Sequence, residues 1–146
     1  MTACTASRAL IDDLVSANHI LYNEAVVDGF GHVSVRHDTR DDRFLLAAGL
    51  APAVVTADDI LELDFEGNVH DTQGRRSYLE RFIHSEIYKA RPDVVAIVHS
   101  HSPAIIPFGV TRATLRPVCH MSGFLGFSTP VFAIRDTAGE NNDMLE

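Results

Sequence analysis

The sequence contains no tryptophan, only two cysteines among its 146 residues, and no long apolar run. Cys4 and Cys119 are too few for a disulfide framework, so we expect a reducing compartment and a cytoplasmic location. No apolar stretch approaches the ~18 residues of a membrane span. Asp12 and Asp13 interrupt the N-terminal segment before the apolar core of a signal peptide could form. We therefore expect no membrane partner.

Basic residues are also scarce, with 12 lysines and arginines against 20 aspartates and glutamates and a net charge of −8. Such a chain lacks the basic surface that nucleic acids require, so no nucleic-acid partner is expected. Hydrophobic residues make up 46% and charged residues 22%, which are the proportions of a globular protein. The length suits one domain with its own core, and a small molecule is the expected partner.

The hydrophobic pattern predicts helices alternating with strands. Helices are expected over 7–27, over 79–90 and from Ser102-Pro103 onward, and strands over 32–36, 43–48, 60–64, 94–98 and 130–134. The run 94–98 is continuously β-branched or small and apolar, which is typical of a central buried strand. This order of elements predicts a layered α/β domain with a mixed sheet.

A His-x-His pair at the end of the run 94–98 is the strongest chemical feature. Residues i and i+2 of a strand point to the same face, so His99 and His101 are expected to present their imidazoles side by side. Two neutral imidazoles at a fixed spacing make half of a divalent-metal site. The alternative is that both histidines only cap the strand and bond Ser100 or Ser102.

An acidic residue on the preceding helix adds a second feature. Glu80 and His84 are four residues apart and share a helix face. A carboxylate beside a metal site is a candidate ligand or acid–base group, whereas glutamate on a helix more often faces solvent.

A glycine-rich entry to the strand 32–36 is the third feature, because glycine allows the backbone to approach a ligand closely. His32, Ser34 and Arg36 share one face of that strand. Arg36 could bind a carboxylate and His32 could donate to an anion. A hairpin with polar outward-facing residues explains the same pattern.

Taken together, these motifs resemble the class II aldolase/adducin family. The segments that carry the resemblance are Asp28-Gly-Phe-Gly-His-Val-Ser34, Val55-Thr-Ala-Asp-Asp-Ile-Leu61, Asp64-Phe-Glu-Gly67, Glu80-Arg-Phe-Ile-His84, Arg91-Pro-Asp93 and His99-Ser-His101. The resemblance implies an α/β/α domain with a central, mainly antiparallel sheet, assembled as a homo-oligomer, commonly a tetramer. It implies that His99 and His101 are two of three histidine ligands of a zinc or manganese ion, and that Glu80 is the acid–base residue.

Two positions differ from the sugar-phosphate members of the family. Those members hold phosphate with a Gly-Asn pair and a Ser-Ser pair, where this chain has Gly31-His32 and Tyr78-Leu79. Without these donors a phosphorylated substrate is disfavoured. The segments Arg116-Pro-Val-Cys-His120-Met and Gly123-Phe-Leu-Gly126 resemble the decarboxylases of hydroxylated aromatic or pyridine carboxylates.

The expected function is therefore that of a metal-dependent carbon–carbon lyase. It would decarboxylate a hydroxylated aromatic or heteroaromatic carboxylate through a metal-stabilised enolate. The residues expected to bind this small-molecule carboxylate are His32, Ser34, Arg36 and His120, although His120 also fits a hydrogen-bonded loop histidine.

Two alternatives stay open at this point. One is a retro-aldolase acting on a non-phosphorylated hydroxy-keto acid. The other is an inactive, adducin-like binding module, because the third histidine ligand of the family lies beyond residue 146. On this reasoning residues 1–146 are expected to be a single domain lacking its C-terminal part, with the metal held weakly or absent.

Overall fold

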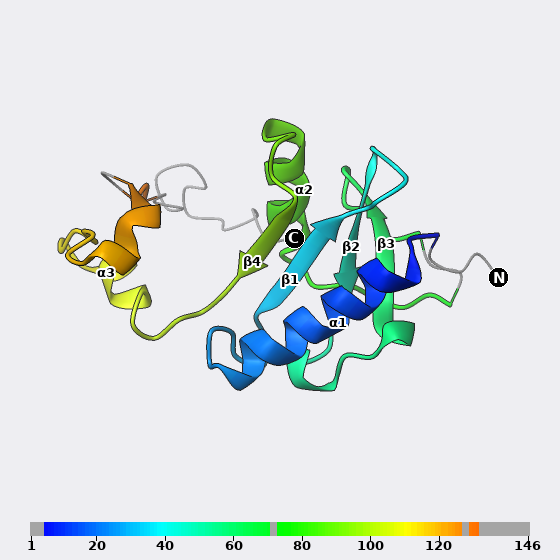
Figure 1. The fold of residues 1–146 in the computed structure, drawn as a ribbon, viewed down its shortest axis with the longest axis horizontal. Coiled ribbons are helices and arrows are strands. Elements are labelled where there is room, and N and C mark those ends of the chain that lie inside the picture. Colours follow the sequence, from blue (N-terminus) through cyan, green and yellow to red (C-terminus); the bar gives the residue numbers. More distant parts are fainter. Residues whose placement is uncertain (1–4, 71–72, 127–128, 132–146) are drawn as a thin grey trace, which may run out of the picture. The chain divides into compact units, whose positions relative to one another are not determined.

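The computed structural model describes residues 5–70, 73–126 and 129–131 (Figure 1). The chain divides into two compact units, residues 1–101 and 102–146, which are treated separately below. The expectation of one domain over residues 1–146 stays a prediction. Most of the strand expected over 130–134 lies outside the described residues.

A four-stranded sheet forms the centre of the first unit. Its strands are β1 (His32–Arg36), β2 (Arg43–Ala47), β3 (Ile60–Asp64) and β4 (Ala96–His99), and their order in the sheet is β3-β2-β1-β4. Every neighbouring pair is antiparallel. The strands expected over 32–36, 43–48 and 60–64 are thus confirmed to within one residue.

The two longer helices, α1 (Arg8–Asn23) and α2 (Arg81–Ala90), pack on opposite faces of this sheet (Figure 1). Alternate residues of β2 point to opposite faces, so each face has its own apolar cluster. The cluster under α1 consists of Ile11, Leu14, Val33, Leu45, Ala47, Val55 and Ile60. The cluster under α2 consists of Phe44, Leu46, Ala48, Leu61, Leu63 and Tyr88. The expected α/β/α layering is confirmed.

The helix boundaries differ from the expected ones for local reasons. The Ser7 side chain accepts a hydrogen bond from the Leu10 amide at 3.3 Å and so caps α1. That helix ends four residues before residue 27, where Ala25 adopts a positive φ of 55°. Helix α2 begins at Arg81 rather than at residue 79, because Glu80 is its N-cap residue. The carboxylate of interest therefore lies at a helix start rather than along a helix face.

Strand β4 is at the edge of the described sheet, which corrects the prediction of a central buried strand. Among the described residues it pairs only with β1. Ile97 packs against the cluster under α2, whereas Val98 is 46% exposed. An apolar β-branched run indicates a strand, but it does not specify how many neighbours that strand has.

The second unit contains a short helix, α3 (Ile106–Val110), and a 3-10 helix over His120–Leu125. The helix expected from Ser102-Pro103 thus begins at Ile106, after a turn. No helix within the described residues is both long and apolar enough to cross a bilayer.

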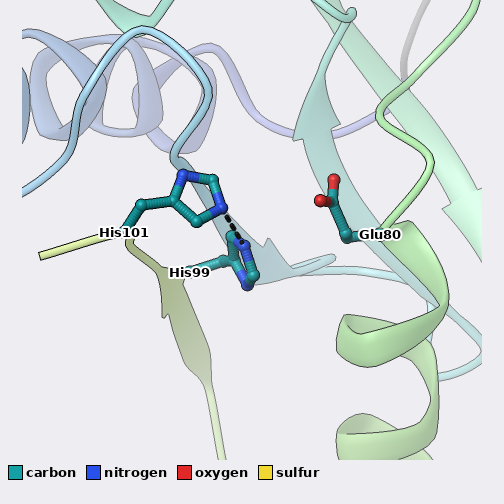
Figure 2. A group of neighbouring side chains, drawn as sticks. All are labelled: Glu80, His99 and His101. Carbon is teal, nitrogen blue, oxygen red and sulfur yellow. Dashed lines mark hydrogen bonds between the residues drawn. The ribbon is translucent and has the colours of Figure 1, made fainter. Parts of the chain in front are cut away.

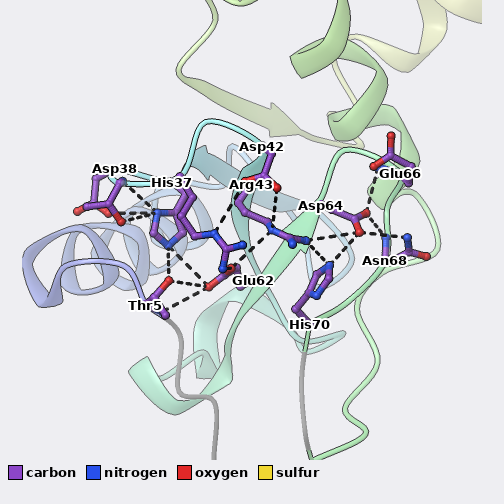
Figure 3. Close-up of polar contacts among 12 residues, drawn as sticks. Thr5, His37, Asp38, Asp42, Arg43, Glu62, Asp64, Glu66, Asn68 and His70 are labelled. Carbon is purple, nitrogen blue, oxygen red and sulfur yellow. Dashed lines mark hydrogen bonds and ion pairs between the residues drawn. The ribbon is translucent and has the colours of Figure 1, made fainter.

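A polar cluster joins the segment before α1 to strand β3 (Figure 3). The buried Glu62 carboxylate accepts hydrogen bonds from the backbone amide and the hydroxyl of Thr5, at 3.3 and 3.2 Å. Its other oxygen accepts from Arg40 at 3.0 Å. Because each oxygen of this buried carboxylate is paired, the cluster fixes the chain's entry into α1.

Arg36 holds the end of β1 to the end of α2. Its guanidinium donates to the backbone carbonyls of Val94, Tyr88 and Arg91 at 2.7, 2.6 and 3.0 Å. It also lies over the Tyr88 ring at 4.7 Å from the ring centroid. A planar fork of donors is needed to reach three carbonyls at once.

We expect Arg36→Lys to lower the free energy of unfolding by about 1–3 kcal/mol, because a single ammonium cannot replace the charge-assisted fork. Chemical denaturation of both proteins measures this difference. The control is Arg8→Lys, on the exposed surface of α1, which should leave the unfolding midpoint unchanged. Equal midpoints for the Arg36 variant and the wild type would contradict the structural role.

Candidate metal centre

Glu80, His99 and His101 converge at one point of the first unit (Figure 2). One potential ligand atom from each side chain lies within 4.8 Å of the other two. The Nε2 atoms of the two histidines are 2.9 Å apart. Figure 2 shows Glu80 at the start of α2, facing the imidazole pair from across a gap. The fold thus brings together three side chains that the sequence analysis singled out as candidates for a metal site.

The pairing of β1 with β4 sets the position of His99. His32 is the cross-strand partner of His99, and their rings stack with centroids 4.7 Å apart and an interplanar angle of 11°. The backbone of Gly31 lies close to its neighbours. A Cβ atom added there would lie 2.6 Å from the Val27 Cβ and 3.0 Å from the His99 carbonyl oxygen. Glycine is therefore required immediately before His32.

Asp28 orients His101. One carboxylate oxygen accepts from the amides of Phe30 and Gly31 at 2.9 and 2.8 Å, and lies 3.2 Å from His101 Nδ1. The Phe30 amide, followed by the bond to His101, lowers the pKa of Asp28. A carboxylate bonded to one ring nitrogen leaves the other free as a ligand, which is how metal-binding histidines are commonly held. Asp28 therefore aims His101 Nε2 toward His99.

Two histidines of this region have lowered pKa values. Burial, followed by the charge of His101, lowers the pKa of His99. Burial, followed by the charge of His99, lowers the pKa of His32 to about 4. A neutral imidazole keeps a lone pair, which a metal ligand needs.

The donor set fits a divalent cation. Two imidazole nitrogens and a carboxylate oxygen are the ligand types of zinc and related metals. Bonds of 2.0–2.1 Å in tetrahedral geometry place two donors about 3.4 Å apart. The observed separation of 2.9 Å needs only a small opening to reach this value. Glu80 keeps 31% of its side chain exposed, so solvent and small molecules reach it.

The other predicted site residues have different surroundings. Ser34 is fully buried, with its hydroxyl 2.7 Å from His84 Nδ1 and 2.8 Å from the Tyr88 hydroxyl. Arg36 is occupied by backbone carbonyls, as described above. His120 is exposed in the second unit. Of the three predicted residues in the first unit, His32 lies beside the converging side chains, with its Nε2 atom 3.7 Å from a Glu80 carboxylate oxygen.

Sequence reasoning noted Asp28 and Tyr78 within motifs but assigned neither of them a role in orienting these side chains. Asp28 opens the glycine-rich segment, and its position before two tight-turn glycines was the available signal. The Tyr78 ring lies 4.2 Å from the His32 ring, centroid to centroid. No periodic pattern leads to Tyr78, because residue 78 belongs to neither a helix nor a named strand.

Comparison with known proteins gives a family for this architecture. Residues 12–142 match the family model described as the class II aldolase and adducin N-terminal domain. The chain belongs to this family. The resemblance noted from the motifs is thereby confirmed.

Three relatives show the range of the family. Decarboxylase tropJ of Talaromyces stipitatus is 42% identical over 126 residues, which cover 82% of this chain and 46% of the relative. Alpha-adducin of Rattus norvegicus is 28% identical over 110 residues, which cover 73% of this chain and 14% of the relative. The structure of L-fuculose 1-phosphate aldolase from Glaciozyma antarctica PI12 is 36% identical, with a TM-score of 0.62, and the match covers 74% of this chain and 47% of the aldolase.

The chain thus spans about half the length of the decarboxylase and the aldolase and a smaller share of the adducin. The family contains a decarboxylase, aldolases, an epimerase and adducins.

We expect Gly31→Ala to lower the free energy of unfolding by about 1–3 kcal/mol, because the added methyl group overlaps Val27 and the His99 backbone. Thermal or chemical denaturation measures this loss. Gly29→Ala is the matched control, since nothing lies within 4 Å of a Cβ at that position. A Gly31 variant as stable as the Gly29 variant would show that the strands can separate there at no cost.

Proposed function

We propose that the protein is a metal-dependent carbon–carbon lyase that decarboxylates a hydroxylated aromatic or heteroaromatic carboxylate. The observation that carries the proposal is the convergence of one potential ligand atom from each of Glu80, His99 and His101 within 4.8 Å of one another. His99 and His101 would hold the cation, of which zinc and manganese are the candidates. The similarity to a decarboxylase at 42% identity supports the reaction type.

Breaking a carbon–carbon bond leaves an electron pair that must be stabilised. A divalent cation supplies a Lewis acid that stabilises negative charge on a neighbouring substrate oxygen. Glu80 then donates a proton to the carbon that has lost carbon dioxide. Its position at the start of α2, facing the imidazole pair, suits that role, and its partial exposure gives a substrate access.

The substrate class follows from the groups around this point. The positions where sugar-phosphate members carry amide and hydroxyl donors hold His32, Tyr78 and Leu79. His32 is fully buried and in contact with the rings of Tyr78 and His99, so it cannot donate hydrogen bonds to a phosphate dianion as an exposed amide would. These features favour a planar carboxylate over a sugar phosphate.

Catalysis by Glu80 is tested with Glu80→Gln. We expect the turnover of hydroxylated aromatic carboxylates to fall at least about a hundredfold, because general acid–base groups contribute 10²–10⁴-fold to the rate. Carbon dioxide release measures the turnover, and the variant should retain its bound metal. Glu86→Gln on the exposed side of the same helix is the control and should be fully active. Undiminished turnover in the Glu80 variant would remove that residue from the mechanism.

Metal binding is tested with Asp28→Asn. Asparagine keeps the oxygen that accepts from the two amides but loses the charge that supports His101. We expect the affinity for Zn²⁺, measured by competition with a chelating dye, to fall by about 10- to 100-fold. His101→Ala should lower it further. Asp12→Asn, at an exposed position of α1, is the control, and an equal affinity in all four proteins would contradict a site at these residues.

A second candidate is a non-catalytic module, which the similarity to alpha-adducin favours. Pure protein that contains no stoichiometric metal and releases neither carbon dioxide nor an aldehyde from hydroxy acids would support it. Aldehyde release from a hydroxy-keto acid would instead indicate a retro-aldolase. We further propose that the enzyme is cytoplasmic and forms a homo-oligomer, which in this family is commonly a tetramer.

A further inference from the structure

Behind the converging side chains, four buried residues form a continuous chain of hydrogen bonds. His32 Nδ1 lies 2.8 Å from His84 Nε2. His84 Nδ1 lies 2.7 Å from the Ser34 hydroxyl, which lies 2.8 Å from the Tyr88 hydroxyl. All four residues are buried to within 1% of full burial. The hydrogen-bond chain passes from strand β1 to helix α2, returns to β1 and ends on α2, and Glu80 lies beside its His32 end.

The hydrogens of this chain must all point in one direction. Burial lowers the pKa of His84 to about 3, so its ring carries one hydrogen at pH 7. His84 therefore donates from one nitrogen and accepts at the other, and the hydrogen bond between His84 Nε2 and His32 Nδ1 leaves one of these two nitrogens bare. If the direction of the hydrogen bond at either end of this chain of four residues is known, the positions of all the other hydrogens in it follow.

The Tyr88 end favours one direction. Burial raises the pKa of Tyr88 to about 12, so its hydroxyl keeps its hydrogen and needs an acceptor. The Ser34 oxygen lies at 2.8 Å, whereas the Val95 carbonyl is at 3.5 Å, beyond the normal range for a hydroxyl donor. With Tyr88 donating, Ser34 donates to His84 and His84 donates to His32 Nδ1. The hydrogen of His32 is then on Nε2.

The other end favours the same direction. His32 Nε2 is buried without a hydrogen-bond partner within 3.5 Å among the described residues, and a Glu80 carboxylate oxygen lies 3.7 Å away. A bare nitrogen lone pair would face that carboxylate and be repelled, whereas an N–H is attracted to it. The Tyr88 end and the His32 end therefore favour the same direction, although Ser34 and His84 lie between them.

We propose that His84, oriented by Ser34 and Tyr88, is a positioning residue that keeps the hydrogen of His32 on Nε2 and so holds a hydrogen-bond donor against Glu80. When Glu80 has given up its proton, this donor stabilises the carboxylate and keeps it directed at the imidazole pair. The effect on catalysis rests on the proposed function, whereas the place of the hydrogen does not.

The first test uses no substrate. Histidine-selective ¹⁵N labelling of the full chain distinguishes a ring nitrogen that carries hydrogen from one that does not. We expect Nε2–H and a bare Nδ1 for His32. Tyr88→Phe removes the hydroxyl donor at the far end but keeps the aromatic ring of residue 88. We expect a second population of the protein to appear, in which His32 carries its hydrogen on Nδ1. Tyr78→Phe is the control: it deletes a hydroxyl beside His32 that bonds the Leu50 carbonyl instead, and should change nothing.

The second test measures turnover. His84→Leu should lower kcat at least about tenfold with KM within about twofold, because it removes the donor to His32 and leaves Glu80 unsupported. His84→Gln should recover most of the lost kcat, because its amide can both accept from Ser34 and donate to His32. A merely structural role would lower the stability of both variants without this selective recovery. If His84→Leu does not fold, Tyr88→Phe takes its place, with a smaller loss of kcat expected.

The outcomes separate the two proposals. A hydrogen on Nδ1 of His32 in the wild type, or a Tyr88→Phe spectrum identical to the wild type, overturns the positioning role whatever the reaction. An Nε2 hydrogen that responds to Tyr88→Phe, in a protein whose Glu80→Gln variant is fully active, supports the hydrogen-bond chain and refutes the catalytic role of Glu80. An equal loss of kcat in the His84→Leu and His84→Gln variants also overturns the positioning role.

Discussion

The antiparallel pairing of β1 with β4 is the constraint on which the candidate site depends. It sets His32 opposite His99, and the stacked rings leave His99 little freedom to turn. His101 follows two residues later and is held from outside the sheet by Asp28. The pairing is possible only because Gly31 lets the two backbones approach. A shift of one residue in this register would turn His32 away from His99 and break the arrangement.

The buried polar chain is also part of the core under α2. Tyr88 packs its ring against Phe44, at 5.3 Å between centroids, while its hydroxyl ends the chain that leads to His32. A buried polar group is tolerable when each hydrogen bond it can make is made, and costly when one is lost. The same residue therefore couples packing to the orientation of the site, and the fold cannot relax around α2 without disturbing His84 and His32.

Much of this arrangement could be predicted from the sequence. Alternation of apolar and polar residues predicted the strands over 32–36 and 60–64, and the two-residue spacing predicted that His99 and His101 lie side by side. The edge position of β4 could not be predicted, because the number of neighbours of a strand is a tertiary property. Ser34 and Arg36 were interpreted as substrate-binding residues, since a strand's polar face is usually its open one. Here helix α2 covers that face, and its own groups engage both side chains.

Four histidines of this region illustrate why residue type alone does not assign roles. His84 and His32 have no exposed surface, His99 is partly buried, and His101 keeps 34% of its side chain exposed. An ion or a substrate must reach a ligand, whereas a supporting group works best where water cannot compete for its hydrogen bonds. The gradient of burial from α2 outward therefore separates the two proposed ligands from the two proposed supporting residues. Because burial also keeps the inner rings neutral, they can support the outer pair without adding charge that would repel a cation.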